Sequence, residues 1–215
     1  MLFSPEDYRK IFHEIKNSIT LISGSLQLIE KQHPKVKDVA YWDECMAEIQ
    51  CLKKMVIELS QFRMGGDLQI HDIDLTELML QIKDSILFFA EESDFHCRLE
   101  MPEKLPHIQG DFLQLKLAII NLLKNSYEAM NKHGEVILSV TPQPDKVELS
   151  ITDFGGGVVP ELCESLFSPR ITTKCEGTGL GLSITYDIIE SHHGTIHFKN
   201  NPPEGCTFFI HLPIK

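Results

Sequence analysis

Apolar side chains recur at alternating spacings of three and four residues through the first part of the chain. One such seam contains Phe12, Ile15, Ile19, Ile22, Leu26 and Ile29, and a second contains Trp42, Cys45, Ile49, Leu52, Val56 and Leu59. This spacing is typical of helices that pack along a coiled-coil-like seam. The residues QHPK interrupt the pattern. The sequence therefore predicts a helical hairpin, from about Pro5 to Lys31 and again from Trp42, with Cys45 in its core.

The two seams also predict a homodimer. A hairpin of two long helices has a small interior, so its apolar stripes close fully only against a second copy, as a dimeric four-helix bundle. The residues Met64-Gly65-Gly66-Asp67 then end the second helix, because glycine adopts the left-handed cap conformation at no steric cost. We place a domain boundary there, which divides the chain into domains 1–65 and 66–215.

The second domain mixes both periodicities. Apolar residues at helical spacing occupy 75–89, 112–122 and the stretch from Leu180 onward. Short alternating runs, typical of strands, occupy 136–140, 147–152, 195–199 and 206–212. The fold class is therefore α+β, with helices layered over a mostly antiparallel sheet.

Charge and composition narrow the function classes. With 20 basic against 31 acidic residues the net charge is −11, which disfavours binding to nucleic acid or to an anionic membrane surface. No apolar run reaches membrane-spanning length, and MLFSPEDYRK has no features of a secretory leader. The six cysteines form no C-x-x-C pair and no zinc pattern. We expect a cytoplasmic protein with free thiols and no membrane segment in this chain.

The stretch NLLKNSYEAM places Asn121 and Asn125 one turn apart on one face of a helix. Amide oxygens are hard ligands that suit Mg²⁺, which is commonly shared with substrate phosphates. Solvated or capping asparagines are the commoner alternative.

The stretch SITDFGGGV places a carboxylate at the end of a strand. Asp153 has the same parity as Val147, Leu149 and Ile151, so it continues the apolar face. Such a carboxylate can accept a hydrogen bond from an exocyclic amine such as that of adenine, and the glycines that follow, Gly155 and Gly157 among them, let a ring approach the main chain. The alternative is a tight turn after a strand.

The stretch PRITTKCEGTGLGLSI leads into a helix. Its glycines Gly177, Gly179 and Gly181 leave main-chain amides able to hold phosphate oxygens, with Lys174 as a nearby cation. A glycine-rich loop alone is weak evidence, and neither a P-loop nor a Rossmann setting surrounds it.

These stretches, in this order behind the segment FHEIKNSIT, closely resemble the transmitter core of two-component sensor histidine kinases. The resemblance extends from His13 to the last strand. The forms HEIKN, NSYEAM and TTK are most similar to those of nitrogen-regulation and sporulation sensor kinases. The resemblance implies a helical hairpin that dimerises and carries a phosphorylated histidine, followed by a Bergerat-type ATP-binding domain.

The resemblance also assigns roles to the helical segment. On a helix, His13, Lys16, Asn17 and Thr20 lie opposite the seam, and taken alone this is a solvated polar face. The resemblance makes His13 the phosphoacceptor and Glu14 the carboxylate that orients or deprotonates its imidazole. Asn17 matches the position that aligns water to dephosphorylate the partner.

For the nucleotide domain, the resemblance implies an ATP and Mg²⁺ site. Asn125 would bind Mg²⁺ with Asn121 beside it, and Asp153 would accept from adenine. The remaining nucleotide-binding positions are Lys124, Gly155, Gly157, Thr173, Lys174, Gly177, Thr178, Gly179, Leu180 and Gly181. The implied partner is the receiver domain of a response regulator.

Two departures from the family pattern carry information. Ser18 replaces the proline that often follows Asn17, so the usual helix kink is in doubt. No sensor segment precedes the hairpin, which suggests either an excised core or a signal received from a separate sensor protein.

The expected activity is autophosphorylation of His13 by ATP and transfer to a receiver aspartate, with reverse phosphatase action as an option. One alternative is an ATPase or serine kinase of the same fold, but those relatives have a glutamate base where Asn121 stands. A second is an ATP-independent phosphotransfer and binding module, which need not retain a nucleotide site. His192-His193 suggests a metal site, but no third ligand has suitable spacing, and a helix end is the simpler interpretation.

Overall fold

The computed structural model describes residues 5–61, 68–89, 93–169 and 179–214, with only the main chain of some helical residues, so that the side chain of His13 lies outside the described part. The chain divides into two compact units. The first contains Met1–Asp67 and Pro169–Gly181, and the second contains Leu68–Ser168 and Leu182–Lys215.

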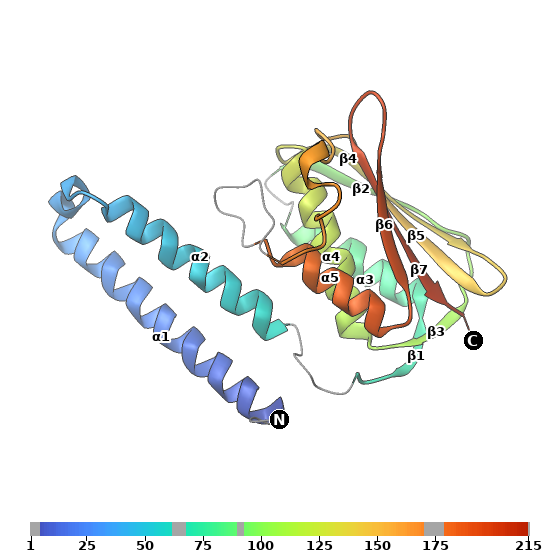
Figure 1. Cartoon of the computed structure of the whole chain (residues 1–215), viewed down its shortest axis with the longest axis horizontal. Coiled ribbons are helices and arrows are strands. Elements are labelled where there is room, and N and C mark those ends of the chain that lie inside the picture. Colours follow the sequence, from blue (N-terminus) through green and yellow to red (C-terminus); the bar gives the residue numbers. More distant parts are fainter. Residues whose placement is uncertain (1–4, 62–67, 90–92, 170–178, 215) are drawn as a thin grey trace. The chain divides into compact units, whose positions relative to one another are not determined.

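Two long helices dominate the first unit (Figure 1). Helix α1 (Pro5–Gln32) is followed by the short helix η1 (Pro34–Asp38) and by α2 (Trp42–Gln61), which lies along α1. Between the two helices, Ser23 is buried and accepts a hydrogen bond of 3.2 Å from the side-chain amide of Gln50. The predicted helical hairpin is therefore present in the single chain.

Each apolar seam of the hairpin divides into an inner and an outer half. On α1, Ile19 and Leu26 are half-buried, whereas the alternate seam positions are exposed: Ile15, Ile22 and Ile29. On α2, Val56 is buried and Trp42 and Ile49 are half-buried, whereas Cys45 and Leu52 are exposed. The expectation that Cys45 belongs to the hairpin core is wrong for the single chain, because this position points to the outer half of the seam.

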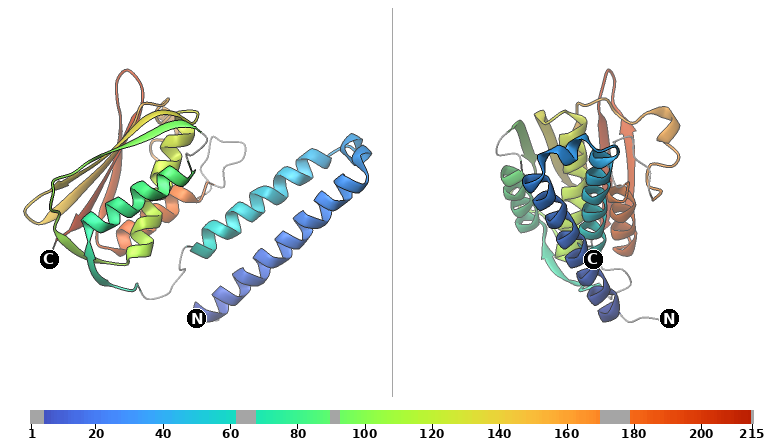
Figure 2. Two further views of the ribbon diagram at one scale, coloured as in Figure 1. Left: turned by 180° about the vertical axis from the view of Figure 1, so that it is seen from behind. Right: turned by 90° about the vertical axis from the view of Figure 1, so that its left-hand side faces the viewer.

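The second unit is built on a mixed five-stranded sheet with the order β2-β4-β5-β7-β6 (Figures 1 and 2). Its strands are β2 (Asp94–Glu100), β4 (His133–Pro142), β5 (Lys146–Asp153), β6 (Thr195–Asn200) and β7 (Cys206–Pro213). Strand β2 pairs with β4 in parallel, and the other three pairings are antiparallel.

Helices α3 (Leu75–Phe89), α4 (Phe112–Ala129) and α5 (Gly181–Ser191) lie on one face of this sheet (Figure 2). Alternate residues of the central strands are buried beneath them, as the period of two requires. This face contributes Val136, Leu138, Val140, Val147, Leu149, Ile151, Phe208, Ile210 and Leu212 to the core. The α+β class is confirmed.

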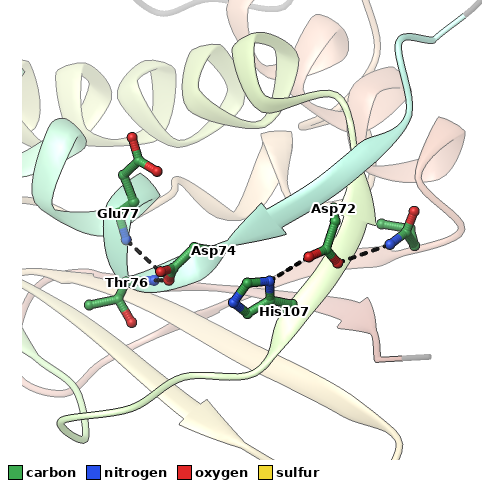
Figure 3. Close-up of polar contacts among 6 residues, drawn as sticks. Asp72, Asp74, Thr76, Glu77 and His107 are labelled. Carbon is green, nitrogen blue, oxygen red and sulfur yellow. Dashed lines mark hydrogen bonds and ion pairs between the residues drawn. The ribbon is translucent and has the colours of Figure 1, made fainter.

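A second, two-stranded sheet pairs β1 (His71–Asp74) with β3 (His107–Gly110) in an antiparallel register. The Asp72 carboxylate lies 2.6 Å from Nδ1 of His107, and this contact raises the pKa of His107 (Figure 3). Asp74 caps α3 by accepting from the amides of Thr76 and Glu77, and these bonds lower its pKa. These contacts fix the entry of the chain into the second unit.

The sequence predicted α1 to α5 and β4 to β7 but not β1, β2, β3 or the short helices η1 and η2 (Pro160–Leu162). Among the described residues, none of the helices combines the length and the apolar character that crossing a membrane requires.

Candidate nucleotide site

The site is organised around the carboxylate at the end of β5. Strand β5 buries every second residue, and Asp153 takes the last of these buried positions with 3% of its surface exposed. The alternation of residues along this strand therefore correctly predicted that Asp153 lies on the buried face. A carboxylate this deeply buried needs hydrogen-bond donors to offset the cost of leaving water.

Three donors surround the Asp153 carboxylate. Oδ1 accepts from the main-chain amides of Gly155 at 3.1 Å and Cys206 at 3.2 Å, and Oδ2 accepts from the hydroxyl of Ser126 at 3.3 Å. Burial raises the pKa of Asp153, and the three hydrogen bonds oppose that rise by favouring the charged form. Each carboxylate oxygen can accept about two hydrogen bonds, so Oδ2 retains the capacity to accept from a further donor such as an exocyclic amine.

Helix α4 brings the two asparagines close to this carboxylate. Ser126, which contacts Asp153, directly follows Asn125 in the helix, and Asn121 lies one turn earlier. Asn121 and Asn125 are half-exposed, and Lys124 is exposed. The structure thus brings the asparagine helix and Asp153 together, as the resemblance implies.

The start of α4 is fixed by contacts that reach distant parts of the unit. The Asp111 carboxylate caps the helix by accepting from the amides of Leu113 and Gln114, and it also accepts from the amide of Gln69. The Asp111 amide donates in turn to Nε2 of His192 at 2.8 Å.

His192 is buried, and its Nδ1 lies 2.7 Å from the carbonyl oxygen of Ile188. Because Nε2 accepts, Nδ1 carries the proton and the ring is neutral, and burial lowers its pKa accordingly. The histidine predicted to mark a helix end therefore ties the end of α5 to the start of α4.

The glycines after Asp153 allow close packing of the main chain. A Cβ atom at Gly155 would lie 2.8 Å from the carbonyl oxygen of Ala129, at the end of α4. Gly157 has φ +72°, and a Cβ atom there would lie 3.0 Å from the carbonyl oxygen of Gly205. At Gly156, by contrast, no atom lies within 4 Å of where a Cβ atom would be. Gly155 and Gly157 therefore have a packing role in addition to the predicted one of admitting a ring.

The segment after this loop is anchored by an aromatic cluster that the sequence analysis missed. The ring of Phe167 lies 5.7 Å from that of Tyr186 on α5, 6.3 Å from that of Phe198 on β6, and 6.5 Å from that of Phe208 on β7. Aromatic pairs at such distances contribute beyond the area they bury. The cluster fixes the chain shortly before the predicted lid.

The predicted phosphate cradle is described only in its second half. Gly179 has φ +66°, a conformation that favours glycine, and Leu180 and Gly181 lead into α5. Thr173, Lys174, Gly177 and Thr178 lie outside the described residues.

The predicted phosphotransfer residues lie on α1. Glu14 and Asn17 are exposed. The hydroxyl of Ser18 lies 2.9 Å from the carbonyl oxygen of Glu14, and α1 continues as a helix through this position.

A divalent cation at the site could take its ligands from both the protein and a substrate. Among the described residues, no group of three His, Cys, Asp or Glu side chains is arranged to hold a metal ion. An amide oxygen from α4 together with substrate phosphates fits the preference of Mg²⁺ for few protein ligands.

Comparison with known proteins agrees with this architecture. Residues 110–215 match the family of histidine kinase-, DNA gyrase B- and HSP90-like ATPases. The chain is 30% identical over 205 residues to the sensor histidine kinase ZraS of Escherichia coli (strain K12), covering 95% of this chain and 44% of ZraS. It is 31% identical over 207 residues to sporulation kinase A of Bacillus subtilis (strain 168), covering 95% of this chain and 34% of that kinase.

The solved structure of histidine kinase ThkA in complex with the response regulator TrrA superposes with a TM-score of 0.66 at 26% identity, covering 98% of this chain and 61% of ThkA. The chain spans less than half the length of the two curated relatives. The similarity to a sporulation kinase confirms the resemblance seen in the sequence. Residues 110–215 therefore form an ATP-binding domain of this family, and the similarity along the rest of the chain supports a histidine kinase transmitter core.

Proposed function

We propose that this chain is an ATP-dependent protein-histidine kinase that phosphorylates itself on His13 and passes the phosphoryl group to an aspartate of a response regulator. The observation that carries the proposal is the buried Asp153 carboxylate, which is fixed by three donors beside α4 in a chain similar to sensor kinases over 95% of its length. Residues 1–65 would serve as the phosphotransfer domain and residues 66–215 as the ATP-binding domain.

In the first step, a neutral imidazole nitrogen of His13 attacks the γ-phosphorus of ATP. A P–N bond forms, the P–O bond to ADP breaks, and ADP leaves with the electron pair. Glu14 orients the ring and accepts the proton from the other ring nitrogen. In the second step, a receiver carboxylate attacks the same phosphorus and forms a P–O bond. The P–N bond breaks with its electron pair on the ring nitrogen, and Glu14 returns the proton, which restores the neutral imidazole.

The residues around Asp153 position the nucleotide. Asp153 would accept a hydrogen bond from the adenine amine, and the amide oxygen of Asn125 would hold Mg²⁺, with Asn121 beside it. When bound, Mg²⁺ would supply charge neutralisation at the phosphates. Lys124, the lid residues Thr173 and Lys174 and the glycines of 177–181 hold the phosphate oxygens.

Two observations favour this function over its alternatives. Asn121 stands where an ATPase or serine kinase of this fold has its glutamate base, which disfavours activation of water or a hydroxyl. An ATP-independent phosphotransfer module would have no use for a buried, donor-lined carboxylate beside α4. The solved complex of ThkA with TrrA supports a response-regulator partner.

The test is to incubate the purified protein with γ-labelled ATP. A phosphorylated histidine is labile in acid and stable in base, whereas phosphoserine shows the opposite behaviour. Label that survives acid, or release of phosphate without any labelled protein, would refute the kinase assignment in favour of the serine kinase or the ATPase. Absence of nucleotide binding would favour the ATP-independent module.

The outer half of the hairpin seam supports a homodimer. The exposed residues Ile15, Ile22 and Ile29 follow one another at intervals of seven on α1, in step with Cys45 and Leu52 on α2. An apolar stripe of this kind costs about 25 cal/mol per Å² when left in water. A second hairpin carrying the same stripe would cover it by two-fold symmetry.

We expect the protein to be a dimer at micromolar concentration, as measured by light scattering. Leu52→Glu should shift the protein toward monomer, because it places a charge in the centre of the proposed interface. Leu80→Glu is a matched control, since Leu80 on α3 is 49% exposed and Leu52 is 48% exposed. A wild-type monomer, or equal dissociation of the two variants, would rule out this interface.

Asn17→Ala should separate two activities. An amide one turn from the phosphoacceptor can hold a water molecule for attack on the receiver aspartyl phosphate, yet it is no base for the histidine. We expect autophosphorylation and transfer within a few-fold of wild type. Stimulated dephosphorylation should fall by about 10-fold or more, since one positioning hydrogen bond contributes about 1.5 kcal/mol.

The measurement is the decay of phosphorylated regulator with added protein and ADP. Gln32→Ala removes another exposed amide of α1, from its last turn, and should leave the decay unchanged. Equal decay with wild type and Asn17→Ala, where wild type accelerates it, would make Asn17 an ordinary solvated residue.

A further inference from the structure

The turn that joins β6 to β7 lies against the loop that follows Asp153. The amide of Asn201 donates to the carbonyl oxygen of Gly205 at 3.0 Å and closes this turn. Gly205 has φ +107°, and a Cβ atom there would collide with the carbonyl oxygen of Asp153. The two segments therefore approach as closely as main chain allows.

Asn200 connects this turn to the far end of the loop. Its side-chain oxygen accepts from the amide of Val158 at 2.8 Å, and its side-chain nitrogen donates to the carbonyl oxygen of Val158 at 2.7 Å. One side chain thereby satisfies both main-chain groups of Val158, as a neighbouring strand would. The two bonds tie Val158 to the end of β6.

The same turn also holds the near end of the loop. The amide of Cys206 donates to Oδ1 of Asp153 at 3.2 Å. Between these ends, a Cβ atom at Gly157 would lie 3.1 Å from the side-chain oxygen of Asn200. Residues 154–158 are thus held at both ends by a single turn.

We propose that Asn200 is a positioning residue for nucleotide binding, which acts by holding the loop 154–158 in the conformation that presents Asp153. This inference rests on the proposed function, since it takes the nucleotide to be the ligand of Asp153. The side chain of Asn200 bonds to the loop at Val158, so its proposed effect on the nucleotide is exerted through the loop. Without Asn200, the free loop samples many conformations, and nucleotide binding must pay the entropy of ordering it.

The inference predicts a change in affinity without a change in the chemical step. Asn200→Ala should raise the KM for ATP and the Kd for ADP about tenfold, because two hydrogen bonds that order the loop are lost. The kcat at saturating ATP should stay near that of wild type, since bound nucleotide restores the loop. Partial unfolding would instead lower kcat through a smaller active fraction.

Two further variants sharpen the comparison. Asn200→Asp keeps an acceptor for the amide of Val158 but faces its carbonyl oxygen with a second acceptor, so it should be no better than Asn200→Ala. Asn201→Ala is the matched control from the same turn. The Asn201 side chain donates to Thr207 instead of the loop, so ADP affinity should be unchanged.

Calorimetry with ADP is combined with amide hydrogen exchange of residues 153–159 in nucleotide-free protein. Faster exchange and weaker ADP binding in Asn200→Ala, with neither in Asn201→Ala, would support the inference. Wild-type ADP affinity in Asn200→Ala, or equal losses in both variants, would overturn it while leaving the proposed function intact. A wild-type protein that binds no ADP would overturn the proposed function and, with it, the nucleotide role of Asn200.

Discussion

Alanine in place of His13 is expected to abolish the formation of phosphoprotein from γ-labelled ATP while leaving nucleotide affinity nearly unchanged. The imidazole nitrogen is the only proposed acceptor of the phosphoryl group, so its removal leaves no nucleophile for the first step. His13 and Asp153 belong to different compact units, so we expect the substitution to leave the hydrogen bonds of the Asp153 carboxylate intact.

The control for this prediction is His33→Ala. His33 is exposed between α1 and η1, and its side chain makes no capping hydrogen bond there. The His33→Ala variant should incorporate as much label as the wild-type protein. If His13→Ala still incorporates label on another residue, His13 is not the phosphoacceptor. Equal loss of label in both variants would also refute the assignment.

Asp153→Asn is expected to weaken adenine nucleotide binding by about 1.5 to 3 kcal/mol, the value of a hydrogen bond to a charged group. The amide can also direct a donor toward the adenine amine, which the carboxylate cannot. Calorimetry with ADP, with and without Mg²⁺, measures the effect. Asn125→Ala serves as a contrast, because it should weaken binding only when Mg²⁺ is present.

The pH dependence of binding provides a second readout of Asp153. Burial raises the pKa of Asp153, and the charged form is the better acceptor, so ADP affinity should begin to fall at a higher pH than an ordinary aspartate would cause. Asp153→Asn should lack this component of the pH profile. Equal affinity of wild type and Asp153→Asn at neutral pH would show that the adenine contact is made elsewhere.

Local patterns predicted the long helices and the inner strands well. The alternation in β4, β5 and β7 reports burial directly, because a buried face repeats with the period of its element. The seams of α1 and α2 predicted the two helices, but alternate seam positions are exposed in the single chain. The missed strands bury little. β1 buries only Ile73, and β2 buries only Phe95 at the sheet edge, although its polar and apolar residues alternate. β2 also pairs in parallel with β4, so no local turn announces the pairing.

For the site, the sequence could supply Asp153 but few of its supports. Parity alone places Asp153 on the buried face of β5. Its hydrogen-bond partners Ser126 and Cys206 are 27 and 53 residues away, and Val158 is 42 residues from Asn200. Such contacts depend on how the strands and α4 assemble. No spacing rule reveals them, and asparagine before Asn-Pro-Pro looks like an ordinary turn residue.

The dependence of Asp153 on the β6–β7 turn also bears on how the protein is made. β7 is the last strand of the sheet to leave the ribosome, yet it supplies the Cys206 amide, and its pairing with β5 extends to the Asp153–Cys206 pair. In a nascent chain from which only α4 and β5 have emerged, the Asp153 carboxylate would lack the hydrogen bond from the Cys206 amide. Under the proposed function, competence to bind ATP would then arise in one late step, after the helical hairpin has been synthesised, and a partly made chain would be inactive.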